Sequence, residues 1–357
     1  MDDLFASICI ITGGDLAHLD ACLSSIQSQQ EAPPFEVIVC ANGCADVLPF
    51  VKARIPDAVV GRAERSKLGA ARNPLIRRAT GRWLLFLDDD VTIRPSFLAD
   101  LSRLAAAHPE AGVLGGPNDT PEGKPMFQVI QGAVLASLIV SGPVRRRYGP
   151  HPAGPADERF FTLCNLAVRR DAMISFPPSL IGAEENAVLA ELHRRGLKMH
   201  YDPTLAAFHA RRPTLRSFAA QMFKYGLGRG QLTRRSPTTL KLPYLIPSGF
   251  VLYLVGLTAL AWLQPLLAVP LLVYAAAAGA TALKIVWDLR RSTHKYVTSA
   301  ATAAILAATV HVYYGIGFLR GLAIPAADDA TEPELRAELA IPGPFDPAES
   351  LELTPTA

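Results

Sequence analysis

The 357-residue chain has little excess charge and few cysteines. Its formal net charge is +3, and its basic residues alternate with acidic ones instead of forming a stripe with aromatic positions, which argues against nucleic acid as a partner. The five cysteines include no CxxC pair. Cys40 and Cys44 lack the second pair or the nearby histidines that a zinc site needs, so we expect reduced thiols in a cytosolic domain.

Charged residues are absent from positions 242 to 283, a run about twice as long as the roughly 20 residues that one membrane-spanning helix requires. Pro265 and Pro270 interrupt this run and predict a hairpin of two helices. A third apolar run begins at Val297. The spans are predicted at about 243–263, 266–284 and 297–319, within a helical region at 241–324.

The residues that flank these spans indicate their orientation. The amino-terminal sequence MDDLFAS lacks the basic flank and apolar core of a signal peptide, so we expect the first domain in the cytosol of a multi-pass inner or plasma membrane protein. Residues 325–357 are acidic and rich in proline and are expected to be disordered on the outer side. Basic residues precede the first span and fill the second loop, at Arg234, Arg235, Lys241, Lys284, Arg290, Arg291 and Lys295.

Residues 1–240 are predicted to form an α/β domain with a mostly parallel, Rossmann-like sheet. Apolar runs at 7–12 and 35–41 predict buried strands with a helix between them, and WLLFLDD predicts a third strand after a helix from Lys67 to Gly81. The segment FFTLCNLAVRR is interpreted as a strand, EENAVLAELHRRG as a helix, KMHYDP as a strand, and residues 214–232 as a helix close to the membrane.

Asp88, Asp89 and Asp90 follow the third strand, at the sheet edge where ligands bind. Burying three adjacent carboxylates at the end of a strand costs free energy unless a cation neutralises them, and hard oxygen ligands suit Mg²⁺ or Mn²⁺. The alternative is an acidic strand end that caps a helix or meets surface arginines.

The run GRWLLFLDDDVTIRPSFLADL resembles the DxD segment of family 2 inverting glycosyltransferases, whose nucleotide-binding domain has the GT-A fold. Four further blocks in the same order are similar to that family: SICIITGG with FEVIVCANGCAD, KLGAARNPLIRRATG, TLCNLAVRRD and GAEENAVLAELHRRG. The resemblance implies that Asp88 and Asp90 are the DxD pair, with Asp90 as a metal ligand and His209 completing the metal site. It also implies donor-nucleotide contacts by Thr12, Asn42, Lys67, Arg72, Asp88 and Asp89.

Glu185, with Glu184 before it, occupies the place of the family's catalytic aspartate, where a carboxylate takes the proton from the acceptor hydroxyl. The alternative is a solvated helix start, since acidic residues suit helix amino termini. Two departures from the family pattern leave the donor open, with a uridine nucleotide as the default. Ala41 stands where an aspartate usually helps to hold the base, and Gly13 and Gly14 replace bulkier residues.

The segment QMFKYGLGRG is similar to the QxxRW-like helix of membrane-linked members. Gln221, Lys224 and Tyr225 would there contact the acceptor or the diphosphate, whereas a plain interface helix is an equal alternative. The run HVYYGIGFLRG resembles bacterial exopolysaccharide glycosyltransferases of the succinoglycan type. Arg145, Arg146 and Arg147 are interpreted as a solvated loop, with lipid phosphate as the alternative.

Together these features predict an inverting transferase that moves a hexose from a nucleotide-diphosphate sugar to a lipid-linked saccharide in cell-surface polysaccharide assembly. Transfer to polyprenyl phosphate itself is the closest rival, and a processive synthase is disfavoured because three spans offer little for an export channel. A rival from another class is a catalytically inactive, sugar-nucleotide-binding membrane scaffold, against which the intact DxD argues.

Overall fold

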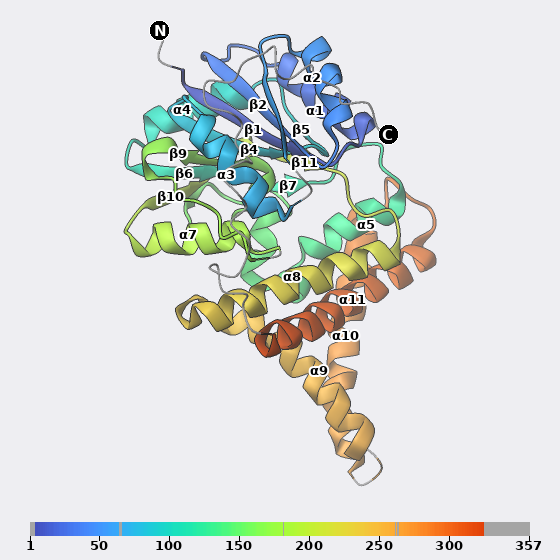
Figure 1. The fold of residues 1–357 in the computed structure, drawn as a ribbon. Helices are drawn as coiled ribbons and strands as arrows, with labels where there is room; N and C mark the ends of the chain where they lie inside the picture. The colour runs from blue at the N-terminus through green and yellow to red at the C-terminus, as the bar shows by residue number, and fades with distance from the viewer. Residues whose placement is uncertain (1–3, 64–65, 181, 261, 263, 325–357) are drawn as a thin grey trace, which may run out of the picture.

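The computed structural model describes residues 4–324 except 64–65, 181, 261 and 263. The acidic tail predicted at 325–357 lies outside the described residues. Figure 1 shows an α/β domain above a layer of helices, from which a helical hairpin projects.

The α/β domain is organised around an eight-stranded sheet that is mostly parallel. In spatial order the strands are β3 (Val59–Ala63), β2 (Phe35–Asn42), β1 (Ala6–Thr12), β4 (Trp83–Asp88), β9 (Leu166–Arg169), β6 (Ala111–Gly115), β10 (Lys198–Tyr201) and β8 (Gly154–Pro155). Strand β9 runs antiparallel to both β4 and β6, and β8 runs antiparallel to β10. The predicted fold class is therefore confirmed.

Alternate residues of the central strands face two separate cores. Ile8 and Ile10 of β1 pack with α1 (Leu16–Gln27), α2 (Leu48–Arg54) and α4 (Phe97–Ala107). Cys9 and Ile11 face the opposite side, where α3 (Leu68–Arg78) and α7 (Glu184–Arg194) pack. Continuous apolar strands are required because helices cover both faces of the sheet.

A small second sheet lies at the ligand edge of the first. It contains β5 (Val91–Ile93), β11 (Ala207–His209) and β7 (Asn118–Asp119) in that order. Its register places His209 opposite Val91, directly after Asp90. This pairing brings residues about 120 positions apart in the chain to the same point.

The helical layer contains α5 (Met126–Leu135), α6 (Leu138–Ser141), α8 (Leu215–Arg235), α9 (Leu242–Leu260), α10 (Val269–Asp288) and α11 (Tyr296–Ala323). Apolar side chains from five of these helices, all but α9, share one core. Helix α9, the segment Pro265–Asp288 and helix α11 are long and apolar enough to cross a membrane. Short 3-10 turns complete the chain at η1 (Ala45–Val47), η2 (Gly142–Arg147), η3 (Leu163–Asn165), η4 (Arg170–Ala172), η5 (Pro203–Leu205), η6 (Pro237–Thr239) and η7 (Pro265–Ala268).

Three local predictions differ from the structure. Helix α3 ends at Arg78, and Gly81 does not stop it: a Cβ at Gly81 would collide with the backbone of Ala6 and Ser7. The predicted strand in FFTLCNLAVRR begins only at Leu166, after a 3-10 turn. Pro270 lies in the first turn of α10, where proline is tolerated, so the break between the two helices is at Pro265.

Candidate active site

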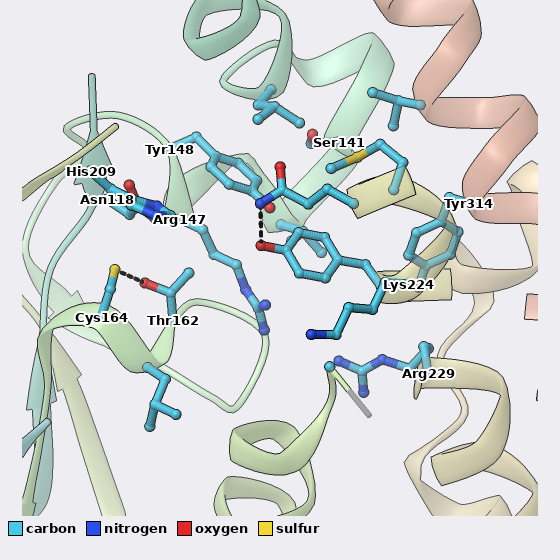
Figure 2. A pocket seen from close by; sticks show the side chains of 18 of the residues that line it. Asn118, Ser141, Arg147, Tyr148, Thr162, Cys164, His209, Lys224, Arg229 and Tyr314 are labelled. Carbon is cyan, nitrogen blue, oxygen red and sulfur yellow. Dashed lines mark hydrogen bonds between the residues drawn. The ribbon is translucent and has the colours of Figure 1, made fainter. Parts of the chain in front are cut away.

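A cavity of about 770 Å³ lies between the sheet edge and the helical layer. At one end it is lined by Gly13, Asn42 and the three aspartates that follow β4, and at the other by side chains of α6, α8, α9 and α11. Figure 2 shows several of these side chains, which converge from loops and helices that are far apart in sequence. Nine of the predicted donor, catalytic and acceptor residues, together with Asp90 and His209, therefore line one space, whereas Thr12 and Lys67 do not.

The three aspartates have three different partners. Asp88 Oδ1 accepts a hydrogen bond of 2.9 Å from the buried Arg72 of α3. Asp89 Oδ2 accepts from the backbone N–H of Gly13 at 3.2 Å, and burial raises the pKa of Asp89. Asp90 Oδ2 lies 2.9 Å from His209 Nε2. Burial alone would raise the pKa of Asp90, but the hydrogen bond and charge of His209 outweigh it and the pKa is lowered.

The predicted metal set of Asp88, Asp90 and His209 is not assembled around one point. Across the described residues, no group of three His, Cys, Asp or Glu side chains is arranged to hold a metal ion. The carboxylate of Asp88 pairs with Arg72. Asp90 and His209 remain together as one carboxylate and one imidazole, a donor set that suits a divalent cation.

Asn118 adds an observation on this pair. Its Nδ2 lies 3.1 Å from His209 Nδ1, while its buried Oδ1 has no hydrogen-bond partner. The two ends of an amide are interchangeable in such an assignment. With Oδ1 toward the ring, Asn118 would accept from Nδ1–H and leave the Nε2 lone pair for a metal, the usual arrangement of a metal-binding histidine. Asp90, His209 and Asn118 therefore fit a metal site whose remaining ligands come from elsewhere.

Three of the other predicted donor contacts have structural partners. Thr12 is buried and does not line the cavity, and its Oγ1 accepts from the N–H of Gly14 at 3.1 Å. Asn42 lines the cavity, and its side chain holds the backbone of Ser66 through bonds of 3.0 and 2.8 Å. Lys67 Nζ donates to Ser179 O at 3.2 Å, so this lysine ties two loops together.

Glu184 and Glu185 form the first turn of α7 and both line the cavity. Glu185 Oε1 accepts a hydrogen bond of 2.7 Å from Asn186 Nδ2 and lies 3.9 Å from Arg147 Nη1. Burial raises the pKa of Glu185. The positive charges of Arg147 and Arg229 oppose this effect, whereas the charge of Glu184 adds to it. A buried carboxyl with a raised pKa beside a cavity is suited to accept a proton.

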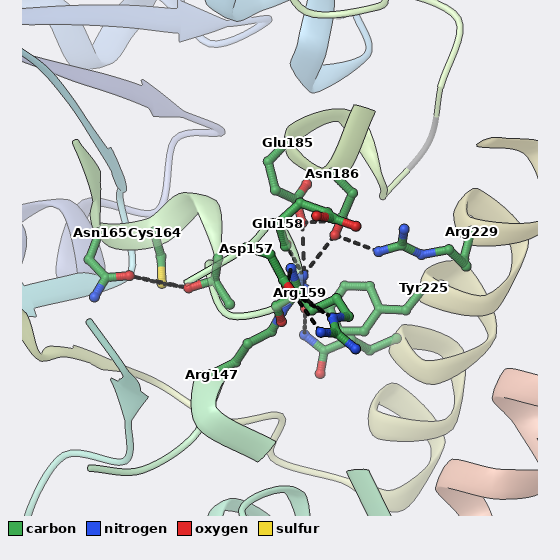
Figure 3. A network of polar contacts seen from close by, with 12 residues as sticks. Arg147, Asp157, Glu158, Arg159, Cys164, Asn165, Glu185, Asn186, Tyr225 and Arg229 are labelled. Carbon is green, nitrogen blue, oxygen red and sulfur yellow. Dashed lines mark hydrogen bonds and ion pairs between the residues drawn. The ribbon is translucent and has the colours of Figure 1, made fainter. Parts of the chain in front are cut away.

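Two arginines reach the same site: Arg147, for which a solvated loop was predicted with lipid phosphate as the alternative, and Arg229, which was not predicted as a site residue. Arg147 Nη2 donates to Asn186 Oδ1 at 2.7 Å, and Arg229 Nη2 donates to the same oxygen (Figure 3). Arg147 also donates to the carbonyls of Glu158 and Arg159, so it is a buried residue and not part of a solvated loop. No local pattern shows that these two side chains are buried, because each becomes buried only when η2, α7 and α8 meet.

Gln221, Lys224 and Tyr225 of α8 all face the cavity. Gln221 Nε2 donates to the Tyr225 hydroxyl at 3.1 Å, and burial raises the pKa of Tyr225. Lys224 is exposed, and Figure 2 shows its side chain pointing toward the same region as Arg147 and Arg229. Helix α8 therefore forms one wall of the cavity.

Comparison with known proteins agrees with this architecture. Residues 7–172 match the glycosyl transferase family 2 domain. The succinoglycan biosynthesis protein ExoO of Rhizobium meliloti is 36% identical over 93 residues, which are 25% of this chain and 27% of that protein. The match thus spans about a quarter of the curated relative.

Among solved structures, the mannosyltransferase PcManGT from Pyrobaculum calidifontis, in complex with GDP-Man and Mn²⁺, aligns with a TM-score of 0.51. It is 18% identical, and the alignment covers 86% of both chains. Residues 1–349 of S. aureus TarS align with a TM-score of 0.46 and 16% identity over 86% of this chain and 90% of that one. The likeness to PcManGT shows that the two chains share a GT-A-like fold.

Proposed function

We propose, on the premise that this chain carries a family 2 glycosyltransferase domain, that it is an inverting, metal-dependent hexosyltransferase acting on a lipid-linked saccharide in cell-surface polysaccharide assembly. One observation carries the proposal: a single cavity joins the aspartates at the sheet edge to a wall of apolar helices. Such a cavity can hold a nucleotide sugar at one end and a lipid-borne acceptor at the other.

Different residues of the cavity bind the donor, hold the metal and accept the proton. Asn42, Arg72, Asp88 and Asp89 bind the nucleotide-diphosphate sugar at the sheet edge. Asp90 and His209 would hold Mg²⁺ or Mn²⁺, which supplies positive charge next to the diphosphate leaving group.

Glu185 takes the proton from the acceptor hydroxyl while that oxygen bonds to the anomeric carbon, and the bond from this carbon to the diphosphate breaks on the opposite face. Asn186 holds the carboxyl of Glu185 in place through its 2.7 Å hydrogen bond. Glu184 is the first residue of the same helix and also lines the cavity.

The proposed location is the inner or plasma membrane, with the catalytic domain on the cytosolic side. Arg234, Arg235 and Lys241 precede α9. Lys284 lies near the end of the returning helix α10, and Arg290, Arg291 and Lys295 lie in the loop that follows it. Basic residues at both ends of this hairpin favour the cytosol for both ends.

The test is a transfer assay with the purified, detergent-solubilised protein. Radiolabelled nucleotide sugars, with UDP-hexoses and GDP-mannose in the panel, are incubated with Mg²⁺ or Mn²⁺ and lipid-linked saccharides extracted from bacterial membranes. We expect label to enter the lipid fraction with inverted anomeric configuration. Label on polyprenyl phosphate alone would support the rival acceptor. Nucleotide binding without transfer to any acceptor would indicate the inactive scaffold.

A further inference from the structure

Arg147 and Arg229 converge on one buried amide oxygen beside the candidate base. The side chains belong to η2 and α8, and Asn186 Oδ1 on α7 accepts from both. The two arginines are 8% and 5% exposed, and Arg229 also lies 4.2 Å above the ring of Tyr244. Two guanidinium groups held this close inside a protein need a counter-charge.

The carboxylate nearest to this pair does not supply that counter-charge fully. Glu185 lies 3.9 Å from Arg147, beyond hydrogen-bond distance, and its oxygen already accepts from Asn186. Lys224 adds a further cation to the same wall of the cavity. This part of the site is therefore suited to an anion with several oxygens, and the guanidinium fork matches phosphate.

Beyond the arginines the cavity wall becomes apolar. Leu138 and Ile139 of α6 are 57% and 50% exposed, and Ile246 of α9 is 62% exposed, yet all three line the cavity. Val310 of α11 continues this wall. A ligand that fits both parts has a phosphate group attached to a hydrocarbon chain.

We propose that Arg147 and Arg229 bind the phosphate of the lipid-linked acceptor and that the hydrocarbon chain leaves the cavity between α6 and α9. This inference rests on the proposed function, because it assigns the acceptor's phosphate to a specific part of the same cavity. It also gives Arg147 a reason for its position next to Glu185: a bound phosphate fixes the attached sugar beside the base.

The test compares Arg229→Gln and Arg147→Gln with the matched control Arg146→Gln, an arginine that stacks on Phe160 and does not line the cavity. We expect both cavity variants to raise the KM for lipid-linked acceptor by about tenfold or more, with an unchanged Kd for nucleoside diphosphate. Arg229→Lys should restore part of the loss. Equal losses of nucleotide and acceptor binding would assign the arginines to the donor phosphates and overturn the proposal.

A direct binding measurement separates this inference from the proposed function. Farnesyl phosphate, farnesol and inorganic phosphate are titrated onto the detergent-solubilised parent and Arg229→Gln proteins, and thermal stability is followed. Farnesyl phosphate should stabilise the parent more than either of the other probes, and Arg229→Gln should lose this difference even if no transfer is ever detected. If farnesol binds as well as farnesyl phosphate, the site does not recognise phosphate.

A second inference comes from the pairing of α8 and α11. The two helices run side by side (Figure 1), and glycines bring their backbones together. A Cβ at Gly226 would collide with the carbonyl of Tyr314, and one at Gly317 with the carbonyl of Phe223. At the far end, Arg234 Nη1 donates to the carbonyls of Leu322 and Ala323.

Helix α8 carries five basic residues and no acidic one, so it is not suited to cross a bilayer. Helix α11 packs along α8 as far as Arg234. Arg234 lies before the start of α9, at the end of the hairpin that is proposed to face the cytosol. Helix α11 begins shortly after the end of α10, and this end of the α9–α10 hairpin lies on the same side of the membrane as the start of α9. Five large apolar residues of α11 are exposed, at Tyr296, Val297, Ile305, Tyr313 and Ile316, while two of its glycines pack against the backbone of α8.

We infer that α11 lies along the cytosolic membrane surface, that only the α9–α10 hairpin enters the bilayer, and that the chain after Ala323 stays on the side of the catalytic domain. This differs from the third span and outward tail predicted from composition.

Cysteine labelling of the full-length protein in intact bacterial cells tests this topology. A cysteine appended after Ala357 should react with a membrane-impermeant maleimide only after the cells are permeabilised. Gln264→Cys at the tip of the hairpin is the positive control for outside labelling, and the parent with its native cysteines gives the background. Labelling of the appended cysteine from outside would restore α11 as a span.

Discussion

At the sheet end of the cavity, the lining side chains follow strands β1, β2 and β4, and their charges are mainly acidic. At the helix end, the lining side chains come from η2, α7, α8 and α9, and cations outnumber carboxylates around Asn186. One end is thus suited to a cation and a nucleotide diphosphate, whereas the other is suited to an anion on an apolar chain. Mutations at the two ends of the cavity should therefore have separable effects on the binding of the proposed donor and acceptor.

The largest effect is expected at the sheet end. Asp90→Ala removes the carboxylate next to His209 and should abolish both turnover and metal-dependent donor binding. Isothermal titration with the nucleotide in the presence and absence of Mn²⁺ measures the second effect. Asp100→Asn on the surface of α4 is the matched control. Metal-dependent donor binding that survives in Asp90→Ala would remove this residue from the metal site.

Glu185 lies between the sheet end and the helix end of the cavity. The variant Glu185→Gln should therefore separate donor binding from the rate of sugar transfer. We expect donor binding to remain and kcat to fall by about 10²-fold or more, as for the loss of a general base. Glu191→Gln, on the exposed side of the same helix, should leave the rate unchanged. A near-normal rate in Glu185→Gln would exclude it as the base.

Asn118→Ala tests whether the amide orients His209. Loss of this partner should weaken Mn²⁺ or Mg²⁺ activation by about 10- to 100-fold, as for other residues that support a metal-binding histidine. The readout is the metal concentration for half-maximal donor binding, measured by titration. An unchanged metal affinity would make Asn118 a structural residue only.

A smaller effect is expected on α8. Lys224→Ala and Tyr225→Ala should each reduce transfer by about 5- to 30-fold, the factor that corresponds to about 1–2 kcal/mol, while membrane attachment and nucleotide affinity stay unchanged. Arg216→Ala, at the exposed start of the same helix, is the control. Parent rates in both cavity variants would make α8 an interface anchor and remove it from the acceptor end.

The smallest effect concerns the pH dependence of the rate. Because burial raises the pKa of Glu185, activity should fall, as pH decreases, at a higher pH than for an ordinary glutamate with a pKa of about 4.3. The charged groups that act on this carboxyl are Arg147, Arg229 and Glu184. Arg147→Gln removes a cation and should shift the acid limb of kcat/KM to still higher pH. A shift to lower pH would contradict the assignment.

Local patterns were sufficient for much of the architecture. Apolar runs predicted β1, β2 and β4, helical spacing predicted α7 and α8, and the resemblance to family 2 pointed to the aspartates after β4. Such features depend on periodicity within about ten residues, so neighbouring positions carry them. The 3-10 turn before β9 was missed because Asn165 bonds to the carbonyls of Pro117 and Leu205, far away in the chain.

The sequence by itself determined the α/β fold class and the three apolar helices, because hydrophobic spacing records them directly. Only the tertiary structure decided that Asp88 pairs with Arg72, that Arg147 and Arg229 share Asn186, and that α11 packs along α8. Arg147 and Asn186 are 39 positions apart, and Asp90 and His209 are 119 apart. The charge of a side chain is local, but its partner is set by the packing of whole elements, so composition alone could not distinguish a buried arginine from a solvated one.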